Sequence, residues 1–136
     1  MGTLIDTSVF IAAERGHFDL GAWLSMRPSE SFAISAVTAS ELLHGVYRAP
    51  PGKRRAARRA FVETVLATYP VHAFDAEAAA LHAAKWAAMA ARGDVIGAHD
   101  LLIAATALLH GHAVATFNGE DFARVPGLEV VVPRVP

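Results

Sequence analysis

The sequence predicts an α/β domain with a mostly parallel central sheet flanked by helices. Short apolar stretches typical of buried strands alternate along the chain with longer stretches of helical composition. The 136 residues fit the usual size of one compact domain. Hydrophobic residues make up 54% of the chain, and 29 of them are alanines, which favour helix. We therefore expect a single domain over residues 1–136.

The first half of the chain contains two predicted strands and four predicted helices. The strands are 3–5 and 32–34, and the helices are 9–14, 19–26, 36–48 and 53–68. Asp6, Thr7 and Ser8 offer successive N-caps for the first helix, and Ser35 caps the third. Two prolines and a glycine at 50–52 form a sharp turn, so the third and fourth helices should make an antiparallel hairpin.

The second half continues the alternation. The predicted strands are 71–74, 113–116 and 128–132, and the predicted helices are 76–92, 100–110 and a short turn or helix at 118–122. Asp75 caps the alanine-rich helix, and Gly93 breaks it. Asp100 opens the next helix, whose body is apolar on nearly every side and should lie in the core.

Composition excludes several classes of function. Twelve basic and thirteen acidic residues give a net charge of −1, so no global basic field favours nucleic acid. The absence of cysteine excludes disulfides, zinc-thiolate sites and thiol nucleophiles. The first residues lack a secretory signal, and no apolar stretch reaches the roughly 20 residues of a membrane span. We expect a cytoplasmic protein that does not enter a membrane.

Three acidic residues are placed where a site would form. Asp6 follows the first strand and Asp100 opens a core helix, while Glu41 lies nearly opposite the core-facing side of its own helix. Taken singly, the two aspartates are ordinary caps and Glu41 is an ordinary solvated residue. Thr7 and Ser8 are better placed as caps, which should free the Asp6 side chain. If the three acids meet, they repel one another unless a hard cation, Mg²⁺ or Mn²⁺, neutralises them.

Four segments in this order resemble the PIN-domain ribonucleases, specifically the VapC-type toxins of toxin–antitoxin pairs. The segments are LIDTSV at 4–9, SAVTASEL at 35–42, IGAHDLLIAA at 96–105, and TFNGEDF at 116–122 followed by VPGL at 125–128. Each segment alone is a weak signal, but their order and spacing match over essentially the whole chain.

The resemblance implies a Mg²⁺- or Mn²⁺-dependent endoribonuclease. Its catalytic and metal-binding acids would be Asp6, Glu41, Asp100 and Asp121, supported by hydrogen bonds from Thr7, Thr116 and Asn118. The fourth position is ambiguous between Asp121 and Asn118, because some relatives place an acid where the amide stands here. The resemblance also implies a cognate VapB-type antitoxin, an RNA substrate and a homodimer.

A basic run provides a second candidate surface. Arg54, Arg55, Arg58 and Arg59 share one side of a helix by their spacing and should contact RNA phosphates or an acidic antitoxin tail, unless they form an ordinary solvated face. His99, next to Asp100, is either a structural histidine or a neighbour of the cleft.

Two rival functions remain beside the nuclease. A phosphoaspartyl phosphatase would use Asp6 as its nucleophile, but Ser8 stands where a second aspartate is expected. A catalytically silent RNA-binding or scaffold domain would not need the three acids that this chain retains.

Overall fold

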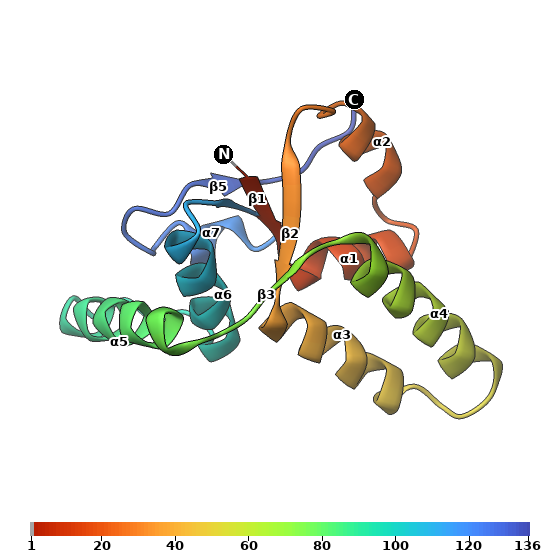
Figure 1. Ribbon diagram of the computed structural model, residues 1–136, viewed down its shortest axis with the longest axis horizontal. Coiled ribbons are helices and arrows are strands. Elements are labelled where there is room, and N and C mark those ends of the chain that lie inside the picture. Colours follow the sequence, from red (N-terminus) through yellow and green to blue (C-terminus); the bar gives the residue numbers. More distant parts are fainter. Residues whose placement is uncertain (1) are drawn as a thin grey trace.

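The computed structural model describes residues 2–136 and contains one five-stranded sheet in which all paired strands are parallel (Figure 1). The strands are β1 (Gly2–Ile5), β2 (Ser31–Ser35), β3 (Val71–His72), β4 (Ala113–Ala115) and β5 (Val130–Val131). Their order is β3-β2-β1-β4-β5, so β1 lies at the centre. This arrangement confirms the predicted α/β class with a parallel sheet. Parallel pairing requires the chain to cross over between neighbouring strands.

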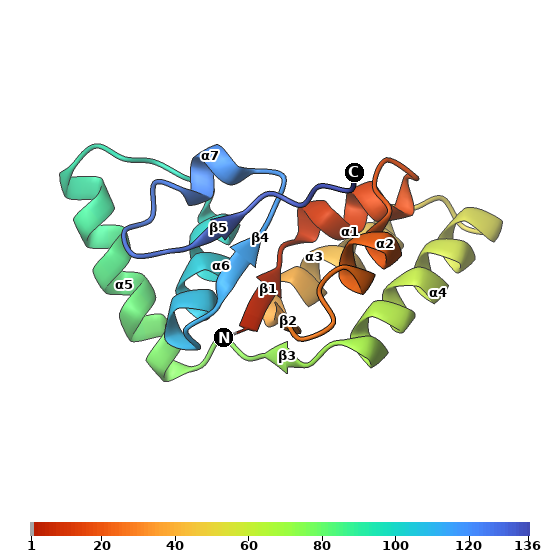
Figure 2. The same ribbon diagram turned by 90° about the horizontal axis from the view of Figure 1, so that it is seen from above.

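Helices flank the sheet on both sides. They are α1 (Thr7–Glu14), α2 (Leu20–Ser25), α3 (Ala36–Arg48), α4 (Lys53–Thr68), α5 (Ala76–Ala91), α6 (Ala98–Leu109) and α7 (Gly119–Phe122). Figure 2 shows α5 and α6 on one side of the central strands and α1, α3 and α4 on the other. The predicted hairpin of α3 and α4 is present, and Gly52 in its turn has φ 110°, a backbone conformation that favours glycine. None of the helices in residues 2–136 has the length and apolarity that a membrane crossing requires.

Successive residues of β1 point to opposite faces of the sheet and thereby build two cores. Leu4 packs with residues of α5, α6 and α7, among them Met89, Ile103 and Phe122. Ile5 packs with residues of α1, α3 and α4, among them Phe10, Val46 and Val62. The apolar body of α6 is buried as predicted, with Ile103, Ala104, Ala105 and Ala107 fully covered. These cores fix the helices that carry the candidate site.

Four elements differ from the predicted boundaries by two or more residues at one end. The helix predicted at 9–14 begins at Thr7, directly after Asp6, and the helix predicted to open at Asp100 begins at Ala98, so Asp100 lies in its first turn. The strands predicted at 71–74 and 128–132 are only two residues long. Both are edge strands with a single neighbour, so less pairing holds them in extended form.

Candidate active site

Asp6 is held at the carboxyl end of β1 by three donors. Its Oδ2 atom accepts hydrogen bonds from Thr116 Oγ1 at 2.9 Å, from Ser8 Oγ at 2.7 Å and from the Ser8 backbone N–H at 3.3 Å. Thr116 is brought alongside because Ile5 of β1 pairs with Ala115 of β4. Asp6 is therefore itself the N-cap of α1, and the expectation that Thr7 or Ser8 would replace it as the cap is wrong. The Ser8 hydroxyl donates to the carboxylate instead.

Glu41 lies on α3 and turns toward the same edge of the sheet. Its Oε1 atom accepts a hydrogen bond from Thr7 Oγ1 at 2.7 Å, and Thr7 also lies 3.1 Å from the hydroxyl of Thr38. His99 Nδ1 on α6 is 3.3 Å from Glu41 Oε2. Neighbours on two other helices, α1 and α6, therefore orient the Glu41 carboxylate. Glu41 is not a freely solvated helix residue.

Asp100 and Asp121 are joined by one amide. Asn118 Nδ2 donates to Asp100 Oδ2 and to Asp121 Oδ2, both at 2.9 Å. On its other side, Asp121 Oδ1 pairs with Arg124 Nη1 at 3.0 Å. The Asn118 side chain therefore spaces two carboxylates, and Arg124 balances part of the charge of one of them.

The four acids share one electrostatic field. The pKa of Asp100 is raised from 3.8 to about 6, first because the carboxyl group is desolvated by burial and then because Asp6 lies nearby. Glu41 and Asp121 raise the pKa of Asp100 further, while the hydrogen bond from Asn118 lowers it. Asp100 is thus the position where excess negative charge is concentrated.

The donor set has the chemistry of a hard cation site, because all four candidate ligands offer carboxylate oxygens. Within residues 2–136, however, no three His, Asp or Glu side chains stand together in the arrangement of a formed metal site. Glu41 is turned toward Thr7 and His99, and Asp121 toward Arg124. The residues fit a hard cation by their oxygen chemistry, and one amide, that of Asn118, already holds the carboxylates of Asp100 and Asp121 next to each other.

Residues 3–128 match the family described as PIN domain. The chain belongs to the PIN-domain family. A curated relative, Ribonuclease VapC1 of Rickettsia felis, is 37% identical over 131 residues, which are 96% of each chain. The crystal structure of FitAcB from Neisseria gonorrhoeae has a TM-score of 0.86 at 30% identity and covers 96% of each chain. That of VapBC-5, a member of the VapBC family of toxin-antitoxin systems from Mycobacterium tuberculosis, has a TM-score of 0.76 at 32% identity over 98% of each chain.

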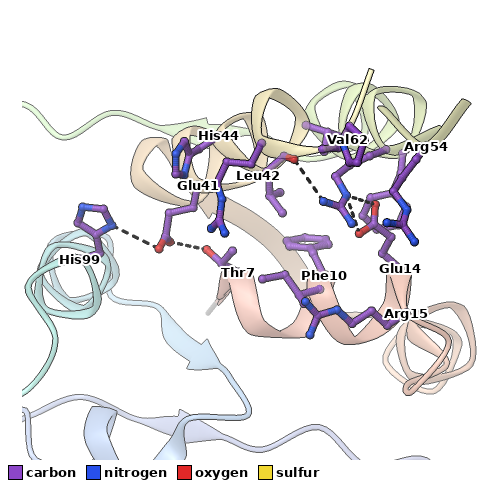
Figure 3. A pocket seen from close by; sticks show the side chains of 17 residues that line it. Thr7, Phe10, Glu14, Arg15, Glu41, Leu42, His44, Arg54, Val62 and His99 are labelled. Carbon is purple, nitrogen blue, oxygen red and sulfur yellow. Dashed lines mark hydrogen bonds and ion pairs between the residues drawn. The ribbon is translucent and has the colours of Figure 1, made fainter. Parts of the chain in front are cut away.

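A pocket of about 530 Å³ opens beside the acids of this PIN domain (Figure 3). Thr7, Glu41 and His99 line one end of it, and Figure 3 shows Arg15 and Arg54 toward the other. The apolar side chains between these ends come from α1, α3 and α4 and include Phe10, Leu42, Phe61 and Val62. The pocket therefore has Glu41 at one end and, at the other, arginines together with Glu14, which pairs with Arg58, over an apolar floor.

The predicted basic run of the PIN domain divides into two groups. Arg55 donates to the carbonyls of Tyr47 and Ala49, and Arg58 donates to the carbonyl of Gly45 and pairs with Glu14 at 3.3 Å. These bonds tie α4 to α3 and α1. Arg59 lies over the Tyr47 ring, with its guanidinium 5.5 Å from the ring centroid. Arg54 is exposed and lines the pocket, so it is the member of the run most available to a ligand.

Two residues contact the acids in a way that the sequence analysis does not predict, Ser8 and Arg124. The serine hydroxyl donates to Asp6 and accepts from the backbone N–H of Phe117, which joins the loops after β1 and β4. The i, i+3 spacing of Asp121 and Arg124 is the sequence signal that identifies this ion pair on a short helix.

Proposed function

We propose that this PIN domain is a metal-dependent endoribonuclease and the toxin of a VapBC-type toxin–antitoxin pair. The observation that supports it most is geometric: Thr116 and Ser8 hold Asp6 at the carboxyl edge of the sheet, and Asn118 donates to both Asp100 and Asp121. Burial, and then the charge of Asp6, raise the pKa of Asp100, which agrees with this arrangement. The names of the curated relatives agree, since they include Ribonuclease VapC1 and Ribonuclease VapC4.

In this proposal Mg²⁺ or Mn²⁺ is held by Asp6, Asp100 and Asp121, with Glu41 as a further ligand or as the group that orients the attacking water. The ion, when bound, lowers the pKa of a coordinated water and neutralises charge on the scissile phosphate. The protein supplies positioning. Thr116 and Ser8 hold Asp6, and the other supporting side chains, Thr7 and Asn118, hold the remaining acids.

Asn118 is best placed as a spacer in this scheme, and Asp121 as the fourth acid. The amide donates from one nitrogen to both Asp100 and Asp121, so it presents hydrogens, not oxygen, to the two carboxylates. A ligand position needs an oxygen facing the ion. We therefore propose Asp121, and not Asn118, as the fourth acid.

The pocket beside the acids is the proposed surface for the macromolecular partners. Its basic end, which includes Arg54, fits RNA phosphates or acidic side chains, and its floor of Phe10 and Leu42 fits apolar side chains. A VapB-type antitoxin segment with acidic and apolar residues would occupy it and block access to Glu41. Solved relatives include VapBC complexes, among them VapBC-5.

We also propose a homodimer in the cytoplasm, which sedimentation analysis of the free chain tests.

The test is RNA cleavage by an Asp6→Asn variant. Asn retains an oxygen that can accept from Thr116 and Ser8, so the fold should survive while the charge is lost. We expect cleavage in Mg²⁺ to fall by at least ~100-fold, and wild-type cleavage to stop in EDTA. Asp19→Asn is the matched control, because Asp19 caps α2 as Asp6 caps α1 but stands apart from the acids. Unchanged cleavage by Asp6→Asn would refute the proposal, and RNA binding without cleavage by the wild type would favour the silent scaffold.

A further inference from the structure

Three histidines from separate segments gather near the end of α6 that lies away from Asp100. His72 ends β3, His110 follows the last residue of α6, and His112 precedes β4. Asp100 is in the first turn of α6 and His110 is at its other end, roughly 15 Å away at the usual rise per residue. The histidines are therefore a separate feature that the proposed nuclease chemistry does not use.

Two of the three imidazoles face each other through nitrogen. His72 Nε2 and His112 Nε2 are 3.2 Å apart. Two imidazole ligands of one metal ion at about 2.0–2.1 Å each, at tetrahedral or right angles, have nitrogens about 2.9–3.4 Å apart. His110 instead stacks on His72, with ring centroids 3.9 Å apart and planes 14° from parallel. The structure thus provides two ligands, and water would complete the coordination.

Both facing rings favour the neutral form that binds metal. Burial lowers the pKa of His72 and of His112, and the charge of His110 lowers each pKa further. Neutral imidazole is the form that coordinates, so at neutral pH an ion competes only with the hydrogen shared between the two nitrogens.

The Nδ1 side of the His112 ring, away from His72, also bears on metal binding. Its Nδ1 atom is buried and has no hydrogen-bond partner among the described residues. A Cβ atom on Gly2 would lie 2.8 Å from His112 Cε1, so only glycine permits this close packing of the ring. The Nδ1 atom of His112 lies 2.9 Å from the same Cβ position, so this side of the ring packs directly against the backbone of β1.

We propose that His72 and His112 bind a transition-metal ion of the imidazole-preferring kind, Zn²⁺ foremost, between their Nε2 atoms. The ion would link the two-residue edge strand β3 to the start of β4 across the sheet. Its ligands are nitrogen, so it is chemically distinct from the oxygen site proposed for Mg²⁺.

The experiment is calorimetric titration of the untagged full chain with Zn²⁺, in millimolar Mg²⁺ and in an Asp100→Asn background that weakens binding at the acids. We expect one equivalent to bind, and His72→Gln or His112→Gln to lower the affinity at least about 10-fold. His17→Gln is the control, because His17 is exposed and outside the cluster. Equal affinity in all variants, or no bound equivalent, would overturn the proposal.

A second measurement does not depend on how the variants fold. With Cu²⁺ as the probe, the electron paramagnetic resonance spectrum of the wild type should show coupling to two imidazole nitrogens. In proton spectra, Zn²⁺ should shift the ring signals of His72 and His112 and leave those of His17 in place. A spectrum with only oxygen ligands, or ring signals that do not move, would contradict the assignment.

Discussion

Replacing Asp100 by asparagine should stabilise the metal-free protein. Asp100 carries the concentrated charge of the acidic cluster, and its carboxylate is both partly desolvated and repelled by Asp6, Glu41 and Asp121. Asparagine removes the charge and keeps an oxygen that can accept the hydrogen bond from Asn118. The same change should abolish the stabilisation that Mg²⁺ or Mn²⁺ gives the wild type.

The size of the effect follows from the pKa of Asp100. A rise from 3.8 to about 6 corresponds to an upper limit of about 3 kcal/mol at neutral pH, at 1.36 kcal/mol per unit. The side chain is only partly buried, so solvent screening reduces this to about 1.5 kcal/mol. For a chain of this length, that is a gain in melting temperature of about 4 °C.

The sign of the pH dependence is fixed by the direction of the shift. Because the pKa of Asp100 is higher in the folded state than in the unfolded state, the folded state holds its proton more tightly. The penalty is therefore absent below about pH 4, grows as pH rises through about 6, and is complete at higher pH. The difference between Asp100→Asn and wild type should follow that curve.

Calorimetric melting from pH 4 to 8, with and without Mg²⁺, measures both effects. At a Mg²⁺ concentration ten times its Kd, the wild type should gain about 1.4 kcal/mol, and Asp100→Asn much less. Glu63→Gln is the matched control, because Glu63 is exposed on α4. An Asp100→Asn variant no more stable than wild type at pH 8, or one with an undiminished response to Mg²⁺, would refute the reasoning.

Four further substitutions test the roles of individual side chains. Thr7→Val removes the hydroxyl that donates to Glu41, so we expect a loss of about 1 kcal/mol in urea unfolding and slower RNA cleavage; unchanged cleavage would show that Thr7 does not position Glu41. Arg58→Ala should lower stability by about 1 kcal/mol through its lost bonds to Glu14 and Gly45, whereas Arg54→Ala should stay within about 0.5 kcal/mol and weaken RNA binding, with a shallower salt dependence; the opposite pattern would reverse their assigned roles. Phe122→Ala should cost about 3–5 kcal/mol in urea unfolding because the ring is fully buried, and a cost below 1 kcal/mol would contradict its place in the core.

Alternation of strand and helix patterns was enough to predict the fold class, and local rules placed the acids. Asp6 follows a strand, and the carboxyl ends of neighbouring parallel strands meet, so its proximity to Thr116 follows from topology. Glu41 lies nearly opposite the core-facing side of its helix. This position excluded burial of the side chain in the core, but it did not distinguish a side chain in solvent from one in a cleft. Only the packing of α1 and α6 against α3 decides between them, through Thr7 and His99.

Contacts between distant segments were beyond such rules. The spacing of Arg55 and Arg58 predicts a shared side of α4, but it does not reveal that carbonyls in the last turn of α3 face that side. The approach of His72 to His112 likewise depends on how β3 and the end of α6 meet. The choice among the caps of α1 was wrong for a different reason. The Ser8 hydroxyl donates a hydrogen bond to the Asp6 carboxylate, so Ser8 supports the cap residue and does not act as the cap itself.

The central claim is that Asp6, Asp100 and their neighbouring carboxylates hold a divalent ion, and a crystal structure grown with Mn²⁺ tests it most directly. Anomalous scattering from manganese should give a peak at the carboxyl edge of the sheet, within about 2.0–2.3 Å of oxygens from Asp6 and Asp100. A manganese-free acidic edge in well-ordered crystals at millimolar Mn²⁺, with the ion found only elsewhere, would contradict the account.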